Sequence, residues 1–205
     1  MPRPRSSREV FVNCLFDPAY TELFNALMFT IYDCGFHPRC AKETDAGDQR
    51  FPKICEMIRE CRLGIHDISR TALDPKAKLP RFNMPLELGV FLGHKTFVEK
   101  KKAFLVMDTK KFRYQKYCSD LAGIDIQAHN ERPKELVRVV RNWLSMNQDV
   151  REVIPDGAEL FERYEQFMVD RPTICKRLRL RIRGILYTDY RTIVEAWILE
   201  NDWRP

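Results

Sequence analysis

Residues 9–18, EVFVNCLFDP, decide the fold because they join a strand signal to the start of a helix. The β-branched and aromatic residues up to Phe16 predict a buried strand. Asp17 followed by Pro18 is typical of a helix N-cap and first turn. Gly35 is expected to end that helix, whose apolar residues recur at helical spacing: Leu23, Phe24, Leu27, Met28 and Ile31.

The same alternation of strand and helix continues to about residue 148. Helices are expected to be opened by Pro52 and Pro85, and an amphipathic helix is expected within residues 130–146. Further strands are predicted at residues 36–43, 62–69, 101–108 and 123–129. This alternation predicts an α/β fold with a flavodoxin-like five-stranded parallel sheet, in the order 2-1-3-4-5.

The pattern changes after the α/β region. Residues 1–8 are expected to form a flexible arm, residues 9–148 the α/β domain, and residues 149–205 a mainly helical C-terminal extension. Between two helices of the extension lies the stretch ICKRLRLRIRG, residues 174–184. Its alternation favours an exposed strand or extended segment, with the end of a basic helix as the alternative. The alternating cations are Arg177, Arg179, Arg181 and Arg183.

Composition narrows the class of protein. The formal net charge of +6, from 35 basic and 29 acidic residues, suits phosphate-bearing ligands or nucleic acid without proving either. The seven cysteines show no C-x-x-C spacing, so neither zinc nor a disulfide framework is expected, and reduced thiols indicate a cytoplasmic protein. The sequence contains no run of 18 apolar residues, so no membrane span is predicted. Glycine-rich phosphate loops are missing as well.

A ligand site is expected beyond the carboxyl ends of the first and third strands, where an open parallel sheet reverses its strand order. The trailing loops of these strands, with the helix opened by Pro85, carry the candidate polar and aromatic residues. They are Asn13, Phe16, Asp17, Asp67, Ser69, Asn83 and Glu87.

Several of these residues also have a plain structural interpretation. Asp17 and Asn83 could cap helices, and Glu87 could serve the dipole of a first helical turn. Because Pro85 disfavours helical geometry at Met84, Glu87 is expected near the third helical position. There the helix N-terminus would favour the ionised carboxylate.

Three motifs carry a resemblance to a known family. HDISR (66–70), LPRFNMPLELGVFLGHK (79–95) and KKAFLVMD (101–108) together resemble the signature of nucleotide-binding TIR-like proteins. The Glu-Leu-Gly helix is also similar to that of nucleoside 2-deoxyribosyltransferases, and VFVNCLFDPAY (10–20) resembles their first strand and substrate-binding loop. The likeness spans residues 9–145. The loop between Ser69 and Asn83 departs from the family by being long and basic.

The resemblance implies an enzyme that acts on the N-glycosidic bond of a nucleotide or nucleoside, with NAD among the substrates. Glu87 would stabilise or trap the ribosyl cation, Phe16 could stack on the base, and the other candidates would bind ribose and base. No cofactor or metal is implied, whereas homo-oligomers and a role in bacterial defence are. Two alternatives stay open, a non-catalytic nucleotide-binding or signalling module and nucleic-acid binding through the basic stretch.

Overall fold

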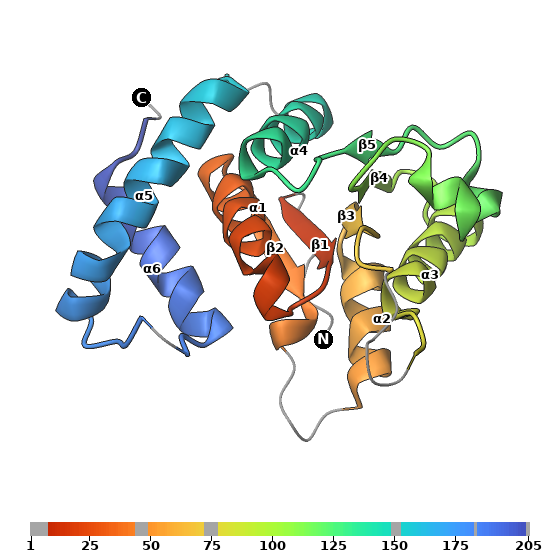
Figure 1. Ribbon diagram of the computed structural model, residues 1–205, viewed down its shortest axis with the longest axis horizontal. Coiled ribbons are helices and arrows are strands. Elements are labelled where there is room, and N and C mark those ends of the chain that lie inside the picture. The colour runs from red at the N-terminus through yellow and green to blue at the C-terminus, as the bar shows by residue number, and fades with distance from the viewer. Residues whose placement is uncertain (1–7, 44–48, 72–77, 149–152, 183, 204–205) are drawn as a thin grey trace.

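The computed structural model describes residues 8–43, 49–71, 78–148, 153–182 and 184–203 (Figure 1). Among these residues, five parallel strands form one sheet in the order β2-β1-β3-β4-β5, which confirms the predicted fold class. Of the expected arm, all but Arg8 lies outside the described residues. The strands are β1 (Glu9–Asn13), β2 (His37–Cys40), β3 (Leu63–Asp67), β4 (Ala103–Asp108) and β5 (Gln127–Ala128).

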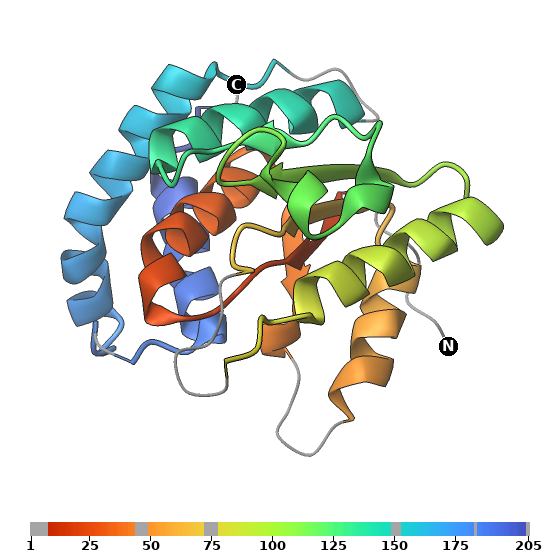
Figure 2. The same ribbon diagram turned by 45° about the vertical axis from the view of Figure 1, so that its right-hand side comes forward.

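Helices cover both faces of the sheet. α1 (Thr21–Asp33) and α4 (Pro133–Asn147) cover one face, and α2 (Arg50–Glu60) and α3 (Asn83–Phe97) cover the other (Figures 1 and 2). Each face of the sheet has its own hydrophobic core, and successive β1 side chains point into opposite cores because side chains alternate across a strand. Val10 and Val12 pack with α1 and α4, and Phe11 packs with α2 and α3.

The chain between β1 and α1 is shaped as its sequence predicts. The Asp17 carboxylate accepts a hydrogen bond of 2.9 Å from the Tyr20 amide and so caps the 3-10 turn η1 (Pro18–Tyr20), which leads into α1. Gly35 follows α1 with a φ of +79°, a conformation that glycine adopts without steric cost. The Phe36 amide then bonds to the Ile31 carbonyl and closes the end of the helix.

Two helices of the C-terminal extension, α5 (Gly157–Arg177) and α6 (Tyr187–Glu200), lie against the outer side of α1 (Figure 1). The ring of Phe29 in α1 lies 5.1 Å from that of Phe167 in α5 and 5.4 Å from that of Trp197 in α6, measured between centroids. These contacts make the extension part of the core that also contains α1 and α4. No helix among the described residues has the length and apolarity needed to cross a membrane.

The basic stretch forms no strand within the described residues, so that part of the prediction is wrong, while residues 178–182 lie outside any helix. α5 continues through Pro172 to Arg177, so the alternative of a basic helix end holds for that residue. The Leu180 amide bonds to the Cys175 carbonyl at 2.8 Å and turns the chain away from the helix axis. Buried Ile174 and Cys175 keep this segment helical, because their packing overrides the period-two pattern of the arginines. Arg183 lies outside the described residues.

Candidate active site

Three separate segments meet at the carboxyl edge of the sheet. β1 and β3 are neighbours, with Asn13 opposite His66 in the strand register. The Asn13 side-chain amide donates a 2.8 Å hydrogen bond to the Met84 carbonyl and lies 3.1 Å from Nδ1 of His66. Buried Asn13 therefore ties the end of β1 to both β3 and the first turn of α3.

Asp67 closes β3 and is only 2 % exposed. Its carboxylate accepts hydrogen bonds from the Tyr20 hydroxyl and, at 2.8 Å, from the Ser69 amide, and Nε2 of His129 lies 3.2 Å away. Burial raises the pKa of Asp67, but His129, Ser69 and Tyr20 together bring that pKa below its usual value. Asp67 is therefore an ionised group that holds three loops of the carboxyl edge together.

Ser69 and His66 complete this part of the edge. The Ser69 hydroxyl is buried and makes no hydrogen bond of ordinary geometry with the described residues, although the Ser69 side chain helps to lower the pKa of Asp67. His66 is fully buried, and burial lowers its pKa to about 3. His66 therefore stays neutral within β3.

The structure corrects the position of Glu87 in its helix. α3 begins at Asn83, two residues before Pro85, because Phe82 adopts a near-helical conformation and its carbonyl accepts a 3.0 Å bond from the Leu86 amide. Pro85 is tolerated in the first turn, where the N–H that proline lacks would have no helical partner anyway. Glu87 is thus the fifth helical residue, beyond the free N–H groups that would stabilise its charge.

Glu87 is nevertheless an unusual side chain. It is 7 % exposed, and its carboxylate forms no hydrogen bond or ion pair with any residue that the structure describes. Burial raises the pKa of Glu87 to about 7, and Arg50 at the start of α2 partly opposes that rise. The expectation that the helix N-terminus keeps this carboxylate ionised is therefore wrong. Near neutral pH the protonated and ionised forms are both populated.

Buried Cys14 follows β1 and packs in the core that contains α1 and α4. Its thiol pKa is raised mainly by burial and further by Cys40, Asp67 and Glu87, while Lys42 lowers it. The sequence pattern gave no signal for Cys14, nor for Tyr20 and His129 as partners of Asp67.

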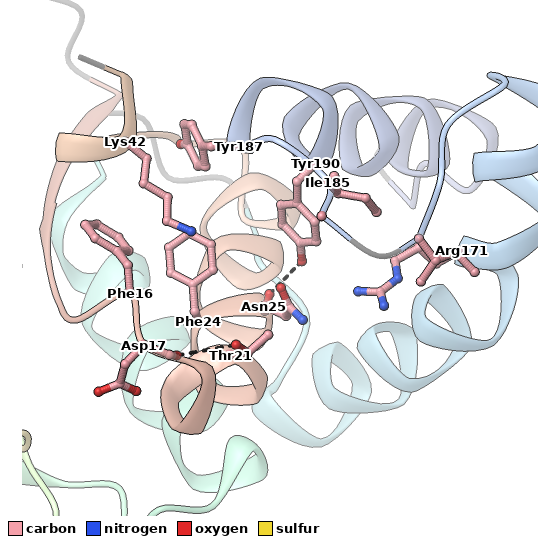
Figure 3. A pocket seen from close by; sticks show the side chains of 12 residues that line it. Phe16, Asp17, Thr21, Phe24, Asn25, Lys42, Arg171, Ile185, Tyr187 and Tyr190 are labelled. Carbon is pink, nitrogen blue, oxygen red and sulfur yellow. Dashed lines mark hydrogen bonds between the residues drawn. The ribbon is translucent and has the colours of Figure 1, made fainter. Parts of the chain in front are cut away.

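The remaining candidates lie elsewhere. Phe16 and Asp17 line a cavity between α1 and the extension, together with Lys42 of the 3-10 turn η2 (Ala41–Glu43) (Figure 3). Asn83 is exposed as the first residue of α3 and caps nothing. The structure therefore places Asn13, Asp67 and Ser69 at the ends of β1 and β3, with Glu87 buried on α3, whose first turn is bonded to Asn13. Phe16 and Asp17 line the other cavity, and the Asn83 side chain is exposed.

Comparison of the chain with protein-family models, curated proteins and solved structures gives no match. Within the described ranges, no three His, Cys, Asp or Glu side chains are grouped so that they could hold a metal ion.

Proposed function

We propose that the protein cleaves or transfers the N-glycosidic bond of a nucleoside or nucleotide, with Glu87 as the catalytic carboxylate. The observation that carries the proposal is a buried glutamate with no partner among the described residues, on the helix that overhangs the ends of β1 and β3. A carboxylate kept in such a place opposes folding, and perturbed groups of this kind cluster at functional sites. The TIR-like and deoxyribosyltransferase-like motifs assign the same residue.

The chemistry needs one carboxylate beneath the sugar. When the C1′–N bond breaks, its electron pair leaves with the base, and positive charge develops on C1′ and the ring oxygen. An ionised Glu87 would stabilise that charge or form a C1′–O bond, giving a glycosyl-enzyme. Water or a second base would then attack C1′ and release Glu87, which accounts for both hydrolysis and transfer.

The neighbouring residues fit supporting roles. The Ser69 hydroxyl would bond to a sugar hydroxyl, and Asp67 would act as a positioning residue because it fixes the Ser69 amide. Asn13 would hold the first turn of α3 through its bond to Met84. The resemblance adds NAD, nucleosides and nucleotides as the substrates to be examined.

The pH dependence of turnover follows from the raised pKa of Glu87. Only the ionised form can stabilise or trap the ribosyl cation. We expect kcat/KM to rise about tenfold per pH unit below pH 7 and to level off above it, since the pKa of Glu87 is about 7. Initial rates between pH 5 and pH 9 measure this profile. A rate that falls as pH rises through 7 would instead indicate that the protonated acid is the active form.

The proposal is tested by incubating the purified protein with NAD and a panel of nucleosides and nucleotides, followed by chromatography. Free nicotinamide or free base is the expected product, together with the ribosyl fragment. Thermal stabilisation by a panel member that stays chemically intact would contradict catalysis. That result would favour the alternative of a nucleotide-binding module.

A further inference from the structure

A cavity of about 250 Å³ lies outside the Glu87 site, between α1, the turn η2 and the chain that joins α5 to α6. Its volume exceeds the space that a few water molecules occupy and approaches that of sites for small ligands. Figure 3 shows that its walls come from both the α/β domain and the C-terminal extension. Four aromatic rings contribute to the lining: Phe16, Phe24, Tyr187 and Tyr190.

Two cations approach this cavity from opposite sides. Nζ of Lys42 lies 5.0 Å from the ring centroid of Phe16 and 4.8 Å from that of Phe24. Arg171 of α5 is half-buried, and it has no hydrogen bond or ion pair with any residue in the described ranges. In Figure 3 its guanidinium points from the opposite wall toward α1.

The charge at the cavity is not neutralised by its own lining. Among the described lining residues Asp17 alone is acidic, and its carboxylate already caps the Tyr20 amide at 2.9 Å. Figure 3 shows that carboxylate turned away from both Lys42 and Arg171. With Lys42 and Arg171 at the cavity and the Asp17 carboxylate pointing away from both, the cavity carries a net positive charge that favours an anionic ligand.

Asn25 offers a neutral polar contact to a ligand in the cavity. The residue is 8 % exposed and lines the cavity, and its side-chain amide has no hydrogen-bond partner among the described residues. The amide atoms are open to the cavity, since they are not among the fully buried unpaired atoms of the described residues. Figure 3 shows this amide on the side of α1 that faces Arg171, while the backbone carbonyl accepts a 3.0 Å bond from the Tyr190 hydroxyl.

We propose that this cavity is a second binding site, for a small phosphate ester of a planar aromatic group such as a nucleoside monophosphate. Arg171 and Lys42 would bind the phosphate, the aromatic walls would contact the planar ring, and the Asn25 amide would hydrogen-bond to the ligand. Because α1 and α5 each supply a contact, the ligand would bridge the α/β domain and its extension. The residues that line this cavity have no role in the reaction proposed for Glu87.

The test is calorimetric titration with adenosine 5′-monophosphate as the probe, beside adenosine and inorganic phosphate. Wild type is expected to bind the monophosphate more tightly than either fragment, because each fragment uses half of the site. Arg171→Gln should weaken binding of the monophosphate by about tenfold to a hundredfold, the usual effect of losing a charge-assisted hydrogen bond. Lys42→Gln removes the other cation from an exposed position and should also weaken it.

A control variant and a common background separate this site from its surroundings. Arg177→Gln removes an exposed cation from the same helix outside the cavity, and it should leave the affinity within about twofold of its parent. Each of these variants is also made in the Glu87→Gln background, where the proposed catalytic site no longer turns the nucleotide over. No measurable binding, or binding that Arg171→Gln and Lys42→Gln leave unchanged in that background, would overturn the proposal.

Discussion

Glu87→Gln is expected to be more stable than wild type at pH 8, by about 3 kcal/mol. The pKa of this carboxyl rises from an ordinary value of 4.5 to about 7 in the folded chain. Each unit of difference corresponds to about 1.4 kcal/mol between the two protonation states. Glutamine keeps the shape of the side chain and removes the charge that burial disfavours.

The sign of the pH dependence follows from linkage. Between pH 4.5 and pH 7 the folded chain retains a proton on Glu87 that the unfolded chain has lost. The free energy of unfolding therefore falls as pH rises through this window, and the full loss is present above it. Glu87→Gln has no such carboxylate, so its free energy of unfolding does not fall in this window for that reason. The free energies of unfolding of the two proteins should therefore differ little near pH 4.5 and most at pH 8.

Urea unfolding at these two pH values measures the difference. Glu165→Gln is the matched control, because it makes the same substitution at an exposed position of α5 and should change stability by less than about 0.5 kcal/mol. If Glu87→Gln proved less stable than wild type at pH 8, the carboxylate would have a favourable partner. Burial of its charge would then not reduce the stability of the folded chain.

Asp33→Ala is expected to destabilise the protein by about 3–5 kcal/mol. The fully buried Asp33 carboxylate at the end of α1 accepts hydrogen bonds from Nε and Nη2 of Arg163 in α5, at 2.8 and 2.7 Å. Removing the carboxylate leaves the Arg163 guanidinium, which is only 14 % exposed, without its counter-charge. Breaking one half of such a pair costs far more than the pair contributes as a whole.

Chemical denaturation of Asp33→Ala beside Glu195→Ala checks this result. Glu195 pairs with Arg191 on the surface of α6, where both side chains are largely exposed, so its loss should cost less than about 1 kcal/mol. A similarly small effect of Asp33→Ala would show that water reaches the Asp33–Arg163 pair. In that case the extension would be held to α1 by its apolar contacts alone.

The order of the strands could be predicted because the evidence for it is local. Short apolar runs ending in polar residues define β1, β3 and β4, and caps such as Asp17 and Gly35 mark where helices begin and end. With right-handed crossovers, few arrangements of five parallel strands remain. The meeting of Asn13, Asp67 and the first turn of α3 follows from that topology.

The errors arise where tertiary packing outweighs a local rule. Pro85 indicates a helix start, but Phe82 and Asn83 already adopt the helical path, which moves Glu87 past the first turn. The charge state of Glu87 depends on burial by distant segments, so its raised pKa could not be inferred from its place in α3. In the same way, His129 and Tyr20 reach Asp67 from positions far away in the sequence.

The cavity beside Arg171 could not be predicted for the same reason. Its lining comes from the loop after β1, from η2 and from the C-terminal extension. Only the packing of α5 and α6 on α1 brings these segments together. The alternating arginines lie in the basic stretch at residues 174–184, whereas Arg171, which lines the cavity, lies earlier in α5 and outside that pattern.

The central claim is that the Glu87 carboxylate performs N-glycosidic chemistry. The most direct measurement is the rate of base or nicotinamide release by wild type and by Glu87→Gln, on whichever substrate the panel identifies, with Glu165→Gln as control. Wild type and the control should release product at equal rates, and Glu87→Gln should be slower by about 10³-fold or more while folded. Release by folded Glu87→Gln at the wild-type rate would contradict the claim.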